Sequence, residues 1–253
     1  MDDTPRPITS HLQELRKRLF WVIGVWGACA AISGLFVSQL FELLMGPAVN
    51  ALRAREYELI AINPPEIFFA YVKTALLVGF LVSIPVTLYQ VWGFVGPALY
   101  QSERRFAIPF VLATTLLFFA GALFGYFVAF PFVFEYFLSL ESDIVRTSWS
   151  VQAIFEFMSR LYLAFGIAFQ LPVAIFFFSL AGIVTPERLA NSRPYAIVIM
   201  FVVGAVLTPP DIVSQVSLAV PLLVLYESGI WISRIVIRRR NEPDKSESTD
   251  LEP

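Results

Sequence analysis

Charged side chains are scarce in this chain of 253 residues: they make up 15% of it, while hydrophobic residues make up 57%. A typical soluble domain is about 25% charged and about 45 to 50% apolar. The mean hydropathy of +0.71 agrees with this deficit of charge. The chain has too few polar side chains to cover a water-soluble body, and its composition therefore predicts a membrane protein.

Cysteine and histidine are almost absent as well, since the chain has one of each, Cys29 and His11. A single cysteine excludes an internal disulfide and a cluster of thiolate ligands, and a single histidine excludes a multi-histidine metal site. We expect no cofactor, no metal and no enzyme active site, because no Ser/His, paired-Asp or metal-ligand pattern occurs. With a net charge of −2, the chain also lacks the excess of basic residues that is typical of a nucleic-acid-binding protein.

Six stretches without Asp, Glu, Lys or Arg predict membrane-spanning helices. They are residues 19–41, 74–102, 106–134, 161–186, 194–210 and 212–226, with the last extending past Glu227 to Ser233. A helix needs roughly 20 residues to cross a hydrocarbon core of about 30 Å. Strands of a membrane barrel would alternate apolar and polar residues, and these stretches do not. The sequence predicts an all-α protein with six transmembrane helices, of which the last two are short.

The first stretch has a second interpretation. Basic residues precede this stretch, and small residues occur at 28–30. A cleaved signal peptide has the same pattern, with small residues at its cleavage site. The stretch nevertheless continues apolar to Phe41, so its length favours a retained first span.

Basic residues are concentrated on one side of the predicted spans. Of the 18 Lys and Arg residues, thirteen lie before the first span, in the loops after the second and fourth spans, or in the tail, and five lie on the other side. Short loops that carry Lys and Arg stay on the cytoplasmic side of the membrane. Both termini are therefore predicted to be cytoplasmic.

Composition divides the chain into three parts. Residues 1–18 predict a cytoplasmic N-terminal amphipathic helix, and residues 19–236 the six-helix transmembrane domain. Residues 237–253 are charged and nearly without apolar side chains, which predicts a disordered cytoplasmic tail. The external loops 42–66 and 135–160 are long enough to fold over the outer ends of the helices.

Prolines interrupt three of the predicted helices. Pro85 lies in the second, Pro172 in the fourth and Pro221 in the sixth. Each proline removes a backbone hydrogen bond and bends its helix. Three bent helices and two short ones predict a curved wall with a recess rather than a straight bundle.

Two acidic residues stand in otherwise basic cytoplasmic segments. Glu14 precedes Arg16, Lys17 and Arg18, and Glu103 is followed directly by two arginines. Each acid could pair with these neighbours in a weak surface ion pair. Alternatively, the two acids receive arginines from a partner, because a guanidinium binds a carboxylate with two parallel hydrogen bonds and lysine cannot copy that geometry.

Two further polar residues have alternative roles. Gln170 lies near the middle of the fourth span, where an amide either joins two helices or contacts a substrate. Asp211 lies at the turn between the two short spans, where it either caps the sixth helix or serves function directly.

Several sequence motifs together resemble one family. They are HLQELRKRL at 11–19, YQVWGFVGPALY at 89–100, ERR at 103–105, FGIAFQLPV at 165–173, RPY at 193–195 and LTPPD at 207–211. In this order, over about residues 8 to 236, the chain resembles the TatC family, the C subunit of the twin-arginine (Sec-independent) protein translocase.

The resemblance implies a concave, glove-like fold and a receptor for folded proteins that carry twin-arginine signal peptides, with export driven by the proton-motive force. It places the chain in the bacterial cytoplasmic (inner) membrane. The partners that it implies are the single-span subunits TatA and TatB, signal peptides of cargo proteins, other copies of this chain and membrane lipids.

The resemblance also assigns roles to single residues. It implies a signal-peptide site at Glu14, Glu103, Phe94 and Arg16, residues linked to translocation at Pro47, Gln170 and Asp211, and a docking region for TatB and TatA at Thr208 and Gln215. The family often has glutamate at the position of Gln170. A proton- or ion-coupled solute transporter is the alternative, but it predicts an ionisable group at mid-membrane, where this chain has only that neutral glutamine.

Overall fold

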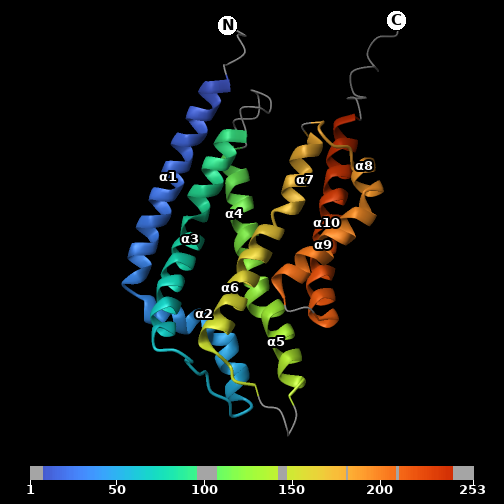
Figure 1. The fold of residues 1–253 in the computed structure, drawn as a ribbon. Coiled ribbons are helices and arrows are strands. Elements are labelled where there is room, and N and C mark those ends of the chain that lie inside the picture. The colour runs from blue at the N-terminus through green and yellow to red at the C-terminus, as the bar shows by residue number, and fades with distance from the viewer. Residues whose placement is uncertain (1–7, 96–106, 142–146, 181, 209–210, 242–253) are drawn as a thin grey trace, which may run out of the picture.

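The fold is helical throughout the part that the structure describes. The computed structural model describes residues 8–95, 107–141, 147–180, 182–208 and 211–241 (Figure 1). In these ranges the β-structure is one isolated bridge, between Ile60 and Ser150. The predicted all-α class is confirmed.

The helices differ widely in length. They are α1 Ile8–Gly34, α2 Val37–Arg53, α3 Pro65–Val95, α4 Ala107–Phe124, α5 Phe130–Ser139, α6 Val151–Ala168, α7 Leu171–Leu180, α8 Pro186–Asn191, α9 Arg193–Leu207 and α10 Ile212–Asn241. A π-helical turn, Gly125–Ala129, joins α4 to α5.

Six apolar segments are suited to the membrane, as predicted. Four of them, Pro65–Phe94, Phe110–Ser139, Val151–Leu180 and Ile212–Ile235, are long and apolar enough to cross it. The bent pair α1 and α2 is a fifth such segment when it is taken as one span, and α9 is a shorter apolar helix at the position of the predicted fifth span.

The first span ends earlier than predicted. Helix α1 stops at Gly34, and the chain turns by 92° into α2, so residues 37–41 belong to the second helix rather than the first span. The spacing of charged residues does not reveal this bend, because no charged residue lies between Arg18 and Glu42.

Helices α3 and α6 begin earlier than the predicted spans at 74 and 161. The reason is that charged residues were taken as span ends, whereas Lys73, Glu156 and Arg160 lie inside these two helices. Lys73 Nζ lies 2.5 Å from Glu156 Oε1. Pairing lowers the cost of placing charges within a span.

The predicted boundaries of the transmembrane domain, at residues 19 and 236, do not coincide with the ends of helices. Helix α1 passes residue 18 without a break, because neither glycine nor proline occurs between Ile8 and Gly24. At the other terminus α10 continues to Asn241, so residues 237–241 of the predicted tail are helical. Residues 242–253 lie outside the described part of the chain.

The long helices give the molecule two distinct ends (Figure 1). The start of α1 and the end of α10 lie at one end, which we call the terminal end. Helix α2 and the loops that follow α2 and α5 lie at the opposite end, the α2 end.

Close helix contacts depend on glycine. Helix α1 packs on α3, α4 on α6, and α10 on both α7 and α9. A Cβ atom on Gly79 of α3 would lie 2.5 Å from Ala30 Cα of α1, and one on Gly121 of α4 would overlap the backbone of Phe165 in α6. Small residues at such crossings allow the backbones of membrane helices to approach.

Two of the three predicted proline sites lie within continuous helices, Pro85 in α3 and Pro221 in α10. Pro172 is the second residue of α7, directly after the break that separates α6 from α7 at Phe169 and Gln170.

Candidate functional site

Glu14 is half-buried at the terminal end, on the second turn of α1. Its carboxylate accepts two hydrogen bonds from Arg18, one turn later: Nε lies 3.1 Å and Nη2 2.6 Å from Glu14 Oε1. Glu14 therefore pairs with a neighbour on its own helix, as the simpler of the two sequence interpretations expects.

Arg18 also reaches a second helix. Its Nη1 donates to Gln90 Oε1 of α3 at 3.1 Å, and its Nη2 donates to the backbone oxygen of Gly93 at 2.9 Å. A Cβ atom at position 93 would lie 2.4 Å from Arg18 Nη1, so Gly93 leaves room for the guanidinium in this position. One side chain thus holds Glu14 and fastens the start of α1 to the end of α3.

The other residues of the predicted signal-peptide site are placed as follows. Phe94 is half-buried on the last turn of α3, next to Gly93. Arg16 is exposed, and its guanidinium carbon lies 5.6 Å from the ring centre of Phe20 on the same helix. Glu103 lies outside the described residues. The structure therefore places Glu14 and Phe94 at the same end, with Arg18 between α1 and α3.

Gln170 lies at the break between α6 and α7 and joins helices. Its side-chain nitrogen donates to the backbone oxygen of Thr114 in α4, at 3.1 Å. Of its two interpretations, this contact favours interhelical packing.

Asp211 begins α10 as a cap. Its Oδ1 accepts from the backbone N–H of Ser214 at 2.8 Å, which satisfies one of the free donors at a helix start. Its second oxygen, Oδ2, is buried and has no hydrogen-bond partner among the described residues.

Thr208 and Gln215 bond within the hairpin of α9 and α10. The hydroxyl of Thr208 donates to Gly204 O at 2.9 Å, and the amide of Gln215 donates to Phe201 O at 2.8 Å. Each of these side chains thus donates a hydrogen bond to a backbone carbonyl within the chain, and docking of a partner at Thr208 and Gln215 stays a prediction.

The chain is similar to known proteins along nearly its whole length. Residues 10–221 match the family model of the Sec-independent protein translocase protein (TatC). The chain belongs to the TatC family. The protein of that name from Aquifex aeolicus is 41% identical over 242 residues, which cover 95% of this chain and 100% of the relative. The one from Escherichia coli K12 is 38% identical over 245 residues, covering 96% and 94%.

A solved structure shares the fold. The crystal structure of the twin-arginine translocase receptor TatC superimposes with a TM-score of 0.82 at 41% identity, covering 90% of this chain and 100% of that one. TatC proteins are components of a protein translocase, not enzymes. In the described residues of this TatC chain, no group of three or more His, Cys, Asp or Glu side chains is placed to hold a metal.

Pro47 has a clear physical consequence in this TatC chain. A proline in a helix has no N–H for the carbonyl four residues earlier, which here is that of Leu43 in α2. The hydroxyl of Tyr126 donates to Leu43 O at 2.8 Å. A Cβ atom on Gly46 would lie 2.9 Å from that hydroxyl, so Gly46 leaves it room. Pro47 thus frees a carbonyl that ties α2 to the π-helical turn.

A second tyrosine supports the same helix. The hydroxyl of Tyr162 in α6 donates to Leu44 O at 3.1 Å, and its ring centre lies 5.6 Å from that of Tyr126. Sequence reasoning identified Pro47 but missed both tyrosines. The sequence does show one tyrosine in each of the predicted third and fourth spans, Tyr126 and Tyr162, and a buried tyrosine hydroxyl usually has a hydrogen-bond partner.

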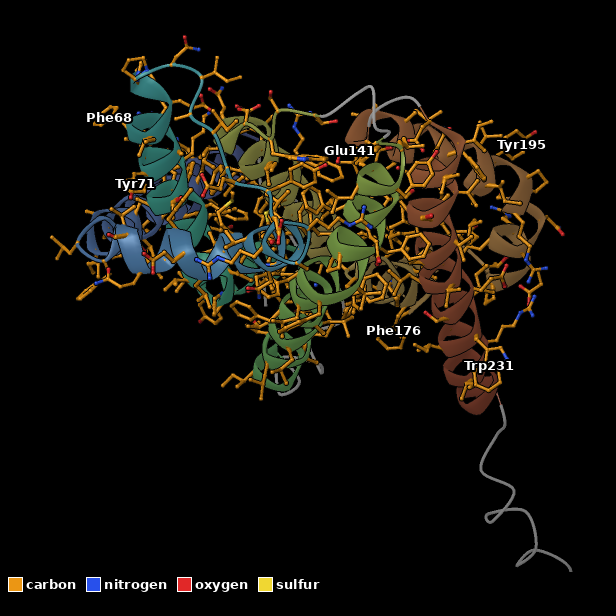
Figure 2. The ribbon with its side chains drawn as sticks, turned by 90° about the horizontal axis from the view of Figure 1, so that it is seen from below. Phe68, Tyr71, Glu141, Phe176, Tyr195 and Trp231 are labelled. Atoms are coloured by element: carbon orange, nitrogen blue, oxygen red, sulfur yellow. The ribbon has the colours of Figure 1, made fainter. Side chains whose placement is uncertain are left out.

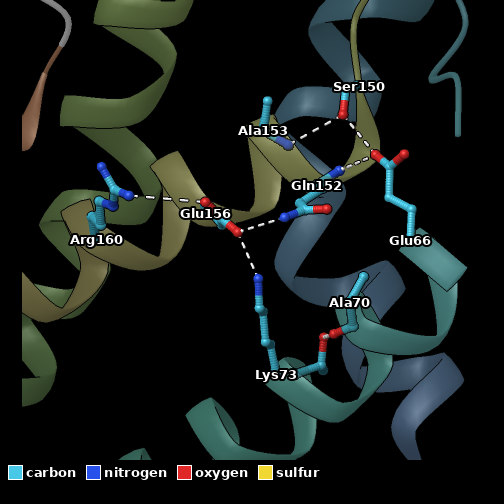
Figure 3. Close-up of polar contacts among 9 residues, drawn as sticks. Glu66, Ala70, Lys73, Ser150, Gln152, Ala153, Glu156 and Arg160 are labelled. Atoms are coloured by element: carbon cyan, nitrogen blue, oxygen red, sulfur yellow. Dashed lines mark hydrogen bonds and ion pairs between the residues drawn. The ribbon is translucent and has the colours of Figure 1, made fainter. Parts of the chain in front are cut away.

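Glu66 is the most densely bonded acid at the α2 end, and it was missed as well (Figure 3). It is only 4% exposed. One carboxylate oxygen accepts from the Ser150 hydroxyl at 2.6 Å and from Gln152 N at 2.7 Å. The other accepts from Ile62 N at 2.7 Å and Asn63 N at 3.3 Å. A single side chain therefore joins the starts of α3 and α6.

The two loops at the α2 end are joined along their backbones too. Ile60 N donates to Trp149 O at 2.9 Å, and Val151 N donates to Ile60 O at 3.1 Å. Partial burial raises the pKa of Glu141 in the second loop, but hydrogen bonds from Tyr57 and Thr147 more than offset it and lower that pKa overall. Backbone and side-chain hydrogen bonds therefore join the two loops.

Proposed function

We propose that this chain is the core receptor subunit of the twin-arginine translocase, which binds twin-arginine signal peptides of folded proteins and organises their export, driven by the proton-motive force. The observation that carries the proposal is the half-buried Glu14 carboxylate at the terminal end, oriented by Arg18, which also bonds to Gly93 of α3, the residue before Phe94. Membership of a family of translocase receptors supports it.

The chemistry suits an incoming arginine. A carboxylate offers about four lone-pair positions, so Glu14 can accept a guanidinium of the signal peptide while it keeps its bonds to Arg18. Arg18 fixes the orientation of that carboxylate in advance, which reduces the entropy lost on binding. In this proposal Glu103 supplies the second carboxylate, and Phe94 and Arg16 complete the site.

The terminal end is proposed to face the cytoplasm of a bacterium, with the α2 end outside the inner membrane. The excess of Lys and Arg in the segments at the terminal end supports this orientation. It places Glu14 where a cargo protein arrives before transport.

The edge formed by α9 and α10 is proposed to dock the single-span helices of TatB and TatA. The 15 residues of α9 rise only about 22 Å, less than a hydrocarbon core of about 30 Å. Exposed aromatic side chains, Tyr195 and Trp231, lie on this side of the molecule, far from Phe68 of α3 (Figure 2).

An apolar cavity of about 280 Å³ between α6, α9 and α10 also supports docking at this edge. Its lining includes Ile167, Ile199 and Val203, which are all partly or largely exposed. Asp211 and Pro47, at the opposite end from Glu14, are proposed to act in the later stages of translocation together with Gln170.

The transporter alternative has no comparable support. The relatives and the solved structure are protein translocase components. The mid-span polar side chain, Gln170, is neutral and bonded to Thr114.

Crosslinking tests the receptor proposal. The full chain in membranes is exposed to a photoreactive signal peptide with Arg-Arg or with Lys-Lys, and the crosslink yield is measured for the native chain, Glu14→Gln and the matched control Gln13→Ala. We expect the native chain and the control to prefer Arg-Arg, and Glu14→Gln to lose most of that preference. Equal yields for the two peptides on the native chain would refute the proposal.

Docking has its own test. Cysteines at Ala205 or Val213, in a Cys29→Ser background, are expected to crosslink to a cysteine in the TatB or TatA helix. Leu116 on α4 is the control, because its side chain is also exposed, by 61%. Equal crosslinking at position 116 would show that contact is nonspecific.

A further inference from the structure

A second cavity, of about 510 Å³, lies between α1, α3 and α6, away from both the Glu14 site and the α9–α10 edge. Most of its wall is apolar, with side chains from all three helices. The apolar lining residues are Trp26, Leu76, Leu77, Phe80, Phe155 and Leu163. The cavity is therefore suited to hydrocarbon.

Two of the charged lining residues, Lys73 and Glu156, lie toward the α2 end of this cavity, and the third, Arg160, lies one turn further along α6. Helices α3 and α6 both run away from the α2 end (Figure 1). Lys73 precedes Phe80 by seven residues, and Glu156 precedes Leu163 by the same interval, which corresponds to about 10 Å along a helix. The mouth near the α2 end is polar, and the cavity becomes apolar toward the middle of the bundle.

Of the three charged residues that line the cavity, two are cations, Lys73 and Arg160, and one is an anion, Glu156; Figure 3 shows their contacts. Glu156 accepts from Lys73 at 2.5 Å and from the Gln152 amide at 3.0 Å. Arg160 lies 3.8 Å from the other oxygen of Glu156, and its side chain is 60% exposed. Two cations thus share one carboxylate, which leaves a surplus of one positive charge beside the opening.

We propose that this cavity binds one phospholipid from the leaflet at the α2 end, with its phosphate against Arg160 and Lys73 and an acyl chain along Trp26, Leu76 and Phe80. The guanidinium fork of arginine suits phosphate oxygens, and the acyl chain supplies the dispersion contacts of an apolar wall. An apolar peptide segment would fill the same hydrocarbon space but would leave the surplus charge uncompensated.

The bound lipid bridges α1 and α3 to α6 and so becomes part of the wall of the molecule.

Photolabelling tests this proposal without any cargo. The full chain is reconstituted in phosphatidylethanolamine vesicles that contain phosphatidylglycerol with a diazirine on one acyl chain, and labelled peptides are identified by mass spectrometry. We expect labelling of α3 and α6 around Leu76 and Leu163. A phosphatidylethanolamine probe with the same diazirine should label these positions less.

Three variants locate the ligand. Arg160→Gln should reduce labelling by about five-fold, the effect of one cation near an anionic lipid. Leu76→Trp should fill the cavity and remove the label while keeping the charges. Arg53→Gln, an exposed cation at the α2 end outside the cavity, should leave labelling unchanged. Lys73 is left intact because its loss would also disturb Glu156.

Specific results would overturn the proposal. Equal labelling of Arg160→Gln and Arg53→Gln would show that no phosphate is bound at the mouth. Equal labelling by the two headgroups would show that the surplus positive charge does not select the lipid, and would overturn the argument from charge. Labelling of the same residues by a photoreactive signal peptide but not by lipid would assign the cavity to a peptide instead. Arg160→Gln alone decides the matter if Leu76→Trp does not fold, since the Arg160 side chain faces solvent or lipid.

Discussion

The two ends of the molecule are held together in different ways. At the α2 end, Glu66 accepts four hydrogen bonds, two tyrosine hydroxyls bind carbonyls of α2, and two loops share a β-bridge. At the terminal end, the guanidinium of Arg18 bonds the start of α1 to the end of α3 and also holds Glu14. The bonds at the α2 end come from several side chains and two loops, whereas one side chain makes these three contacts at the terminal end.

This difference suits two roles, a structural one for the α2 end and the proposed receptor role for the terminal end. At the α2 end the Glu66 carboxylate and the carbonyls of Leu43 and Leu44 form hydrogen bonds within the chain. At the terminal end the guanidinium that joins α1 to α3 also holds Glu14, the proposed ligand for a signal arginine. Binding there is therefore connected to the packing of α1 on α3, whereas the α2 end can stay unchanged.

The largest expected effect is at the α2 end. Glu66→Ala leaves four donors without their acceptor, and each lost bond to a buried charged group costs about 1.5 to 3 kcal/mol. We expect a total loss of stability above about 3 kcal/mol, measured as a lower thermal unfolding midpoint in detergent and faster proteolysis of the loops. Glu58→Ala, an exposed acid nearby, is the control and should change neither. Similar midpoints for the two variants would remove the contrast between the ends.

The terminal end should respond in binding rather than in stability. Glu14→Ala and Glu103→Ala should each weaken twin-arginine peptide binding by about 1.5 to 3 kcal/mol, roughly ten-fold to a hundred-fold, while Glu103→Asp keeps part of it. Arg18→Lys should weaken binding as well, because lysine cannot reach Glu14, Gln90 and Gly93 together. Titration with a labelled peptide measures this, with Lys17→Ala as control. Unchanged affinity in both alanine variants would remove these acids from the site.

A smaller effect sharpens the role of Pro47. Tyr126→Phe should destabilise the chain by about 1 kcal/mol through loss of one hydrogen bond. In a Pro47→Ala background the cost should shrink, because alanine supplies a backbone N–H to Leu43 O. Tyr162→Phe should cost the same in both backgrounds, since Leu44 O already has the N–H of Ala48 as a helical donor. Equal costs for Tyr126→Phe in the two backgrounds would contradict the mechanism.

The smallest effect is expected at Gln170. Gln170→Leu removes a hydrogen bond between membrane helices, which averages about 0.6 kcal/mol, and should impair export without preventing insertion. Gln170→Glu should keep export working, as the resemblance to the family implies for an acid at this position. An export assay compares both with the native chain. Wild-type export by Gln170→Leu would limit the residue to packing.

The sequence predicted the class of this fold well, and some boundaries poorly. Charge-free stretches identify the spans because lipid excludes unpaired charge. The same rule misplaced the starts of α3 and α6, since Lys73 and Glu156 pair inside the membrane domain. The bend after Gly34 changes no composition and so left no trace in the pattern.

The site was predictable only in part. Motifs placed Glu14 and Phe94, because those residues sit in recognisable stretches of chain, and the family resemblance added Pro47. Their partners escaped notice because the bonds join distant residues: Arg18 and Gln90 are 72 positions apart, and Tyr162 and Leu44 are 118 apart. No local pattern encodes such pairs, since only the tertiary fold brings them together.

The bonds of α2 also set an order for biosynthesis. The carbonyl of Leu43 has no hydrogen-bond donor within the chain until Tyr126 has been synthesised. Ile60 has no bridge partner until Trp149 has been synthesised. A chain emerging from the ribosome at about 5 to 20 residues per second therefore carries an unfinished α2 for several seconds. A nascent chain that stalls before residue 149 therefore leaves the backbone groups of Ile60 without their partners in the second loop.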